Sequence, residues 1–345
     1  MKPSVLKRVV LFSVSIVLFS GVNALAIEPI PEEPGWSGFV NIGLAYFDAE
    51  TNMVAGVDNL SMDVGKSVID SLDASPDSES FATPQFNLNV NYTFSTGTQI
   101  FLGNSLEDAV QFDTASVLGV RQQFRDRSIL EFSSVSTPFL FPIQVWEDPY
   151  VTGVPRRETD QTSRGFRLEY DKILGSGFGF QYTQRETDID NERSGLTQLG
   201  LSPSQARLLD RQGDVKNIAV YYQMKPIGRN IFKILLRHRK DDLDGDAMAG
   251  DFNQVQLTHV YLGQRFTFAT NLYAGQKDFD ASNPIFSKTR DDDVYGVGLV
   301  VYDKGLFNSE SWVGQATLLW YEQDSNIDFY DARSSMVSLG VQYRF

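Results

Sequence analysis

The amino-acid sequence predicts an all-β fold, a transmembrane antiparallel β-barrel of about fourteen strands. Three observations predict it. Apolar and polar residues alternate along many stretches of the chain, and in a barrel strand this alternation turns side chains toward lipid and lumen in turn. Short and long connections alternate between these stretches, as expected for short periplasmic turns and long extracellular loops. The last stretch ends on an aromatic residue, Phe345.

The first 26 residues have the three parts of a cleaved secretory signal peptide, which are basic residues, a short apolar run and a small-residue cleavage site. The parts are Lys2, Lys7 and Arg8, the apolar residues 9–19, and Ala24 and Ala26. The apolar run is shorter than a membrane-spanning helix requires. We therefore expect cleavage after Ala26 and export of the chain.

Composition narrows the possible functions. The chain has no cysteine, which excludes disulfides, thiolate catalysis and cysteine-ligated metals. Its formal charge is −14, and loss of the three leader cations takes it to −17 (−14 − 3). Such acidity argues against nucleic acid as a partner.

Residues 27–34 hold three prolines and three glutamates. They predict a short periplasmic segment before one barrel domain over 35–345.

The strands follow in order from Gly35. Residues 85–94 alternate most strictly, with Phe86, Leu88 and Val90 on the face opposite Asn87 and Asn89. The predicted strands are 35–47, 85–94, 99–106, 112–124, 128–136, 165–172, 178–186, 215–224, 231–240, 253–262, 266–275, 293–303, 311–322 and 334–345. This is fourteen strands, with twelve or sixteen left open because three of the stretches alternate poorly. An even number returns both chain ends to the periplasmic side.

The predicted connections differ in length at the two ends of the barrel. The short ones are 95–98, 125–127, 173–177 and 263–265, and the long ones are 48–83, 137–164, 187–214, 241–252 and 276–292. Aromatic residues such as Tyr92, Phe94, Phe266 and Tyr343 lie toward strand ends, where aromatic rings suit the membrane interface.

The final eight residues resemble the β-signal of outer-membrane proteins, which the barrel-assembly machinery reads as an edge strand. The residues that carry the resemblance are Ser338, Gly340, Tyr343 and Phe345. In combination with the leader and the strand pattern, they predict the outer membrane of a Gram-negative bacterium. Its lipids and lipopolysaccharide are then expected partners.

Two further segments resemble an uncharacterised family of Gram-negative outer-membrane proteins, classified as a domain of unknown function. They are Gly35-Trp36-Ser37-Gly38-Phe39, at the start of the first strand, and the loop 195–213 (GLTQLGLSPSQARLLDRQG). The resemblance implies the cellular location and a porin-like barrel over nearly all the exported chain. It implies no activity and no functional residues.

Strand parity turns a set of charged residues toward the lumen. The set is Arg121, Arg167, Glu169, Asp171, Lys233, Arg237 and Arg239. In an open pore, such bases and acids would face each other across the lumen and filter solutes. In a closed barrel the same charges would pair and fill the interior. Because fourteen strands enclose more space than side chains alone fill, the pattern favours a channel.

One loop element is expected either to cap the rim of the barrel or to constrict its mouth. Ser202 and Pro203 begin a short helix over 202–211 as N-cap and first helical residue. If Leu208 and Leu209 anchor this helix in the external mouth, Arg207 and Arg211 narrow the pore.

The sequence gives little support for a catalytic site or a metal site. Parity places both histidines, His238 and His259, on the lipid face, and no serine or aspartate lies beside either in a triad-like arrangement, so we expect no enzyme and no cofactor. Asp242, Asp244 and Asp246 loosely resemble a calcium loop but lack its spacing and its closing glutamate. A solvated charge run is favoured there.

The sequence therefore predicts an outer-membrane channel for passive diffusion or uptake of small solutes. The alternative is a structural or surface-exposed binding barrel with an occluded lumen. A transporter of hydrophobic substrates with an internal plug is less favoured, since residues 27–34 are too few to form one, although the predicted loop 48–83 is long enough to fold inward.

Overall fold

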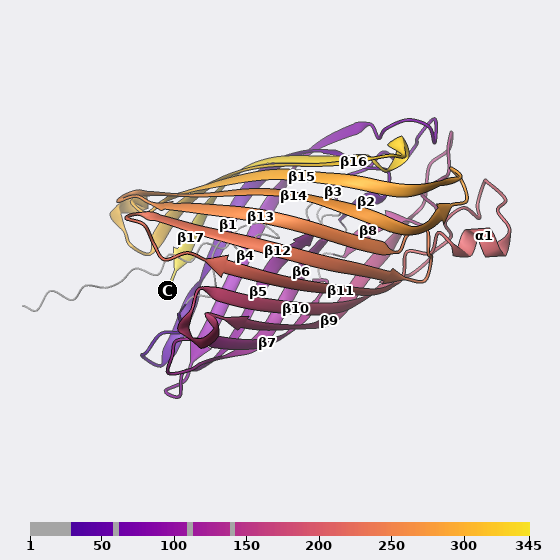
Figure 1. Cartoon of the computed structure of the whole chain (residues 1–345). Coiled ribbons are helices and arrows are strands. Elements are labelled where there is room, and N and C mark those ends of the chain that lie inside the picture. Colours follow the sequence, from indigo (N-terminus) through magenta and orange to yellow (C-terminus); the bar gives the residue numbers. More distant parts are fainter. Residues whose placement is uncertain (1–28, 58–61, 109–112, 139–141) are drawn as a thin grey trace, which may run out of the picture.

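The computed structural model describes residues 29–57, 62–108, 113–138 and 142–345; the predicted cleavage site at Ala24 and Ala26 lies outside them. Figure 1 shows a single barrel with the C-terminus at one end and the helix α1 at the other. The strands of its wall are β1 (Gly35–Glu50), β4 (Ser78–Thr93), β5 (Thr98–Asp108), β6 (Asp113–Gln123), β7 (Ile129–Ser136), β9 (Glu158–Asp171), β10 (Phe178–Ile189), β11 (Gly213–Gln223), β12 (Asn230–Leu243), β13 (Gly250–Leu262), β14 (Phe266–Asn283), β15 (Lys288–Asp303), β16 (Trp312–Ser325) and β17 (Ala332–Arg344).

The remaining elements are short. They are the strands β2 (Val54–Val57), β3 (Met62–Asp63) and β8 (Ile143–Trp146), the helix α1 (Pro203–Arg207), and the 3-10 turns η1 (Ile173–Gly175), η2 (Leu306–Asn308) and η3 (Asp328–Tyr330). No helix in the described part of the chain is long and apolar enough to cross a membrane.

The wall strands form a closed ring of fourteen antiparallel strands. Each strand pairs with its neighbours in the wall, and β1 pairs with both β4 and β17. Gly38 and Phe345 exchange backbone hydrogen bonds of 3.0 and 3.1 Å at the seam. The prediction of fourteen strands is confirmed, and the open alternatives of twelve and sixteen are wrong.

Alternation along the strands explains why this ring is stable in a membrane. On β1, the outward side chains of Ile42 and Leu44 are 63% and 68% exposed, whereas the inward Asn41 and Ala45 are each 2% exposed. Other wall strands repeat this pattern, with large apolar residues on the outside. A contiguous apolar band of this kind matches lipid, because hydrocarbon accepts apolar side chains and a closed ring leaves no unpaired strand edge.

Aromatic rings gather on the outside near the chain termini. Trp36 lies 5.1 Å from Tyr92, and Trp312 lies 4.9 Å from Tyr343, measured between ring centroids. The strands are joined at this end by short turns, such as the one in which Phe94 donates to Thr98 at 2.8 Å and Gly97 adopts a φ of +74°. These rings form the girdle expected at one membrane interface.

The strands extend further at the opposite end than predicted. Half of the predicted loop 241–252 and most of the predicted loop 276–292 are strand, and the connections themselves are only 244–249 and 284–287. In this region outward side chains form surface ion pairs, such as Lys216–Asp242 at 3.0 Å and Arg164–Glu186 at 3.2 Å. A wall that rises above the bilayer is wet on its outer face, so the apolar alternation that identifies membrane strands disappears there.

Candidate functional site

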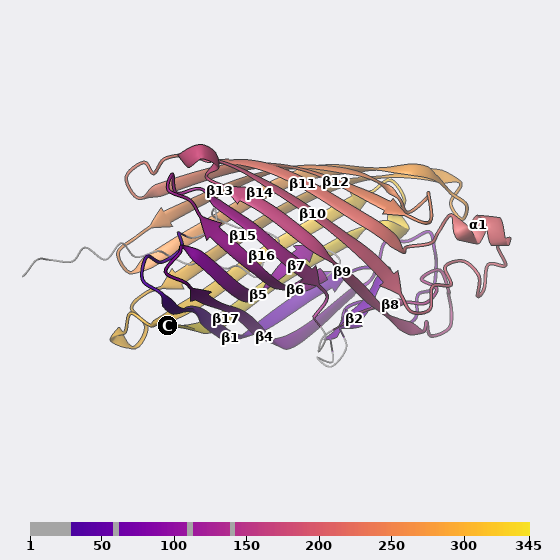
Figure 2. The same cartoon turned by 90° about the horizontal axis from the view of Figure 1, so that it is seen from below.

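The predicted lumen charges all lie on inward-facing positions of the wall. Arg167, Glu169, Asp171 and Lys233 are at most 7% exposed, and Arg121, Arg237 and Arg239 are partly buried. Figure 2 shows, from below, the barrel wall that carries them. The bases and acids do not face each other across a pore. They share one side of the ring.

Ion pairs run up this side, which comprises β5, β6, β7, β9, β10, β11 and β12 and is called the charged wall below. Arg121 Nε lies 2.7 Å from Glu131 Oε2, and both residues are register partners on β6 and β7. Arg167 contacts both carboxylate oxygens of Glu107 at 2.7 Å. Higher in the barrel, Arg185 forms an ion pair with Asp113. Each of these three arginines thus has a carboxylate beside it, which offsets the cost of its burial.

A tyrosine connects the next group of charges. The Tyr221 hydroxyl lies 2.9 Å from both Glu169 Oε1 and Asp171 Oδ1, and Lys233 Nζ lies 4.1 Å from the centre of its ring. The ring therefore joins a cation on β12 to two acids on β9.

The opposite side of the ring is mostly neutral in its periplasmic two thirds, and we call β13 to β17, β1 and β4 the neutral wall. Most of its inward side chains are apolar, amide or hydroxyl groups. Some of the polar ones pair with each other, as in Thr258 Oγ1 donating to Asn271 at 2.7 Å and Asn41 Nδ2 donating to Gln315 at 2.5 Å. In contrast, Thr267 Oγ1 and both polar side-chain atoms of Gln342 have no hydrogen-bond partner among the described residues. A buried apolar cluster includes Val260, Val300 and Tyr302 on this wall.

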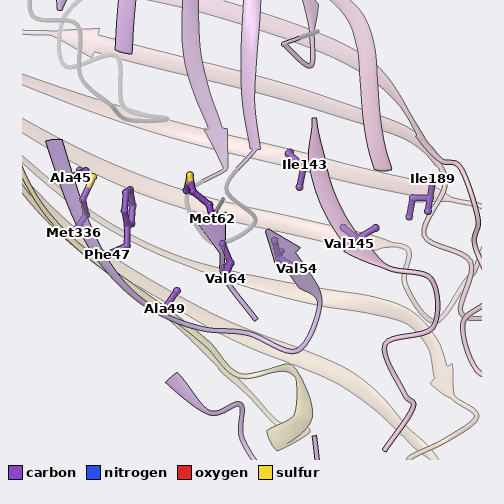
Figure 3. Packing of buried hydrophobic residues seen from close by; sticks show 10 residues of the cluster. All are labelled: Ala45, Phe47, Ala49, Val54, Met62, Val64, Ile143, Val145, Ile189 and Met336. Carbon is purple, nitrogen blue, oxygen red and sulfur yellow. The ribbon is translucent and has the colours of Figure 1, made fainter. Parts of the chain in front are cut away.

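Part of the connection between β1 and β4 folds into the barrel. Strand β2 pairs with β8, with Val54 opposite Val145, and β8 pairs with the external end of β9. The buried side chains around β2, β3 and β8 form one apolar cluster that also contains Phe47 of β1 and Ile189 of β10 (Figure 3). Because β10 lies nearly opposite β1 around the ring, this cluster spans the lumen. We call residues 51–57 and 62–69, together with β8, the plug.

A tight backbone approach holds the plug together. A Cβ atom at Gly56 would lie 2.1 Å from the carbonyl oxygen of Met62, and one at Gly65 would lie 2.4 Å from that of Val54. Only glycine allows the chain to fold back on itself this closely.

Above the plug, six external connections pack into an apolar cluster that we call the lid. Its buried members are Ile69, Tyr150, Leu209, Ala247, Met248, Ile327, Phe329 and Tyr330, with Ile285 and Phe286 against them. These connections leave the rim all around the ring, so their contact closes the external mouth.

Two polar contacts fix the lid. The hydroxyls of Tyr150 and Tyr330 lie 2.7 Å apart, and burial raises the pKa of both phenols. Arg156 is 5% exposed and donates to the carbonyls of Asn52 at 2.8 Å and Pro149 at 3.1 Å, and to that of Lys66. Burial lowers the pKa of Arg156. This guanidinium therefore joins the lid to the plug through backbone carbonyls.

The predicted helix is present, but it does not constrict the mouth. Ser202 caps α1 as expected, with Pro203 as its first residue, yet Figure 1 shows α1 projecting from the external end. Arg207 is exposed, while Leu208 and Leu209 pack into the lid. Arg211 alone of the four reaches the interior, where it contacts Glu192 at 2.6 Å. The constriction comes from the plug, whose strands are paired through residues far apart in sequence.

The weak calcium candidate is wrong in its geometry. Asp242 points outward to Lys216, and Asp244 and Asp246 are exposed. Among the described residues, no group of three or more acidic, histidine or cysteine side chains could hold a metal ion.

Both histidines lie on the outer face, in different rows. His259 stacks on Phe232 at 4.7 Å between ring centroids, and His238 Nδ1 lies 3.0 Å from Asn253 Oδ1. Neither side chain reaches the lumen.

A cavity of about 140 Å³ lies between the plug and the lid. Its charged lining residues are Asp113, Arg185, Arg211, Arg239, Asp241, Lys277, Arg290 and Asp292. Its apolar lining includes Val54 and Val145 of the plug, Met248 of the lid, and Phe279 of the wall. The cavity is the one place in the described lumen where plug, lid and both walls meet.

The sequence from residue 35 to residue 344 matches a family described as a protein of unknown function, DUF2860. The chain belongs to the DUF2860 family. The resemblance to an uncharacterised outer-membrane family is therefore confirmed. No curated protein matches the chain.

Several solved structures resemble this DUF2860 chain in fold. The outer membrane channel DcaP of Acinetobacter baumannii is 9% identical, with a TM-score of 0.44 over 91% of this chain and 97% of that one. An anion-selective porin from Comamonas acidovorans is 11% identical, with a TM-score of 0.38 over 91% and 99%. OccAB1 of Acinetobacter baumannii is 8% identical, with a TM-score of 0.44 over 90% and 97%.

Sequence reasoning missed most residues of the cavity in this DUF2860 barrel. Lys277, Arg290 and Asp292 fall in the segment predicted as loop 276–292. A signal was available, because Arg290 and Asp292 share parity with Val300 of the same strand. Arg239 and Asp241 repeat the same Arg-x-Asp spacing on β12.

Proposed function

We propose that this barrel is a gated outer-membrane channel for small solutes, with the plug as its gate. The observation that carries the proposal is the plug itself, which fills a wide ring by folding a connection inward. Fourteen strands enclose more space than inward side chains fill, so removal of the plug from the lumen opens a path. Strand β2 pairs with β3 and β8, so its release breaks these short pairings but can leave the ring of fourteen wall strands intact.

The charged wall also supports a role in the passage of solutes. The ion pairs of the charged wall satisfy each other along the barrel, from Arg121–Glu131 near the periplasm to Arg185–Asp113 near the plug. A path beside them is polar and nearly neutral in charge, which suits small hydrophilic solutes.

Planar-bilayer conductance tests the gate. Val64 is fully buried in the cluster of the plug, so Val64→Asp introduces an unpaired charge there and drives the segment out. We expect the wild-type barrel to open rarely and Val64→Asp to open more often and to a larger conductance.

Val154→Asp is the matched control, because Val154 is 52% exposed in the connection after β8. It should conduct like the wild type. Heat-modifiable mobility on gels verifies that each barrel is folded. If the wild type and Val64→Asp are both silent while folded, the gate is excluded and the barrel with an occluded lumen is favoured.

A further inference from the structure

The cavity contains an arginine that is held rigidly and keeps one donor edge unused. Arg290 is 7% exposed, and its Nε and Nη2 donate to the carboxylate of Asp292 at 2.8 and 2.6 Å. Its guanidinium carbon lies 4.4 Å from the ring centre of Phe279 and 3.9 Å from that of Tyr330. Among the described residues, Nη1 has no hydrogen-bond partner. Since the guanidinium is planar and Asp292 occupies one edge, the edge with Nη1 is available to an acceptor in the cavity that Arg290 lines.

A second cation lies against the same aromatic ring. Lys277 Nζ lies 4.5 Å from the ring centre of Phe279 and 2.5 Å from Asp241 Oδ2. The same aspartate also binds Arg239, whose Nε lies 2.6 Å from Oδ1. Two cations thus share the carboxylate of Asp241, and one of them, Lys277, lies beside Phe279.

The lining as a whole has a small excess of positive charge. The lining contains five cations and three carboxylates, and a fourth carboxylate, Glu192, binds Arg211 from outside the lining. Counted with Glu192, the lining has one more cation than carboxylate (5 − 4). Low dielectric around buried groups makes such an excess attractive to an anion.

Between these charges the lining holds apolar and aromatic side chains, together with the neutral polar groups of Thr51, Gln161, Ser163, Thr187 and Gln323. Phe279, Tyr330, Tyr321, Val54, Val145 and Met248 contribute its side walls. Its volume of about 140 Å³ compares with the ~150 Å³ of an engineered protein cavity that admits one benzene ring.

We propose that this cavity binds a small aromatic monocarboxylate. The carboxylate accepts from Arg290 Nη1 and Lys277 Nζ, and the ring lies against Phe279 and the valines of the plug. The inference deepens the proposed function, because it names the solute class that the gated channel would accept. A ligand that contacts both plug and lid can also shift the gate, provided that it binds the closed and open forms with different affinities.

Binding is tested on the complete barrel, folded in detergent, by isothermal titration calorimetry with benzoate as the probe. Benzamide is the matched neutral probe, and cyclohexanecarboxylate is the matched anion without an aromatic ring. We expect benzoate to bind, benzamide to bind at least about tenfold more weakly, and cyclohexanecarboxylate to fall between them.

Two variants assign the binding to the two cations. Arg290→Gln and Lys277→Gln should each weaken benzoate binding about 10- to 100-fold, as expected for loss of one hydrogen bond to a charged group. Lys277→Gln is the more decisive, because Lys277 does not touch the lid whereas Arg290 also stacks on Tyr330. Arg164→Gln removes an exposed cation from the outer face and should leave binding unchanged.

The outcomes separate this inference from the proposed channel. Absence of benzoate binding at millimolar concentration, equal binding of benzamide, or unchanged binding by Lys277→Gln would each overturn the aromatic carboxylate site. Liposome-swelling measurements of flux are made on the same proteins. A barrel that binds benzoate but never conducts supports the site and contradicts the channel, whereas one that conducts without binding does the reverse.

Discussion

The two walls of the lumen accommodate their inward polar side chains in different ways. The charged wall alternates acids and bases on neighbouring strands, so that Arg121, Arg167 and Arg185 each contact a carboxylate. The neutral wall uses amides, hydroxyls and apolar residues, as in the pair of Thr258 and Asn271. Charges that neutralise each other along one wall produce little field across the lumen. In the proposed channel, selectivity would then depend on the cavity between the plug and the lid.

Among the substitutions proposed here, Arg185→Leu in the charged wall should cause the largest loss in the free energy of unfolding. Arg185 is 8% exposed and binds Asp113, and its Nη1 also donates to Ser163 at 2.9 Å. Its removal leaves Asp113 buried without its guanidinium, and we expect a loss of about 3–5 kcal/mol in the free energy of unfolding. Guanidinium unfolding of the barrel in lipid, followed by tryptophan fluorescence, measures the loss.

The double variant Arg185→Leu with Asp113→Asn is the control, because it removes both charges. It should recover most of the stability. If Arg185→Leu alone costs nothing, water fills this part of the lumen and the contrast between the two walls has no energetic consequence.

Ile42→Arg tests whether the outer face of β1 contacts lipid. Ile42 is 63% exposed in the middle of β1, between the inward residues Asn41 and Gly43. A charge facing the hydrocarbon near mid-bilayer costs about 2–4 kcal/mol. The same unfolding measurement should show this loss, whereas Lys240→Arg on the external rim of β12 should show none. Equal stability of Ile42→Arg and the wild type would mean that β1 does not face lipid there.

The sequence predicted all fourteen wall strands because the bilayer imposes alternation on each of them. Prediction failed where that constraint ends. Lys240 and Asp242 point outward on β12 above the membrane, and a strand with polar residues on both faces resembles a loop in sequence. The external ends of β12, β14 and β15 were therefore assigned to connections.

The site was predictable only where it shares strands with the membrane part of the wall. Arg239 and Arg167 were placed in the lumen by parity, which is a local property. The plug depends on pairing between Val54 and Val145, which are far apart in the chain, and no local pattern specifies that contact. Arg156 could not be recognised either, because its partners are backbone carbonyls, which every residue carries.

Thr258→Val should produce the smallest of these effects, on the neutral wall. Thr258 is 3% exposed, donates to Asn271 at 2.7 Å and accepts from Gln256 at 3.1 Å. Valine keeps the shape but removes the hydroxyl, and we expect a loss of about 1 kcal/mol in the free energy of unfolding. Thr162→Val, on the outer face of β9 above the bilayer, serves as the control and should change stability little. A loss for Thr258→Val as large as that for Arg185→Leu would show that both walls depend equally on complete pairing. The smaller loss instead fits a wall whose polar groups are neutral and therefore less costly to leave unpaired in a buried position.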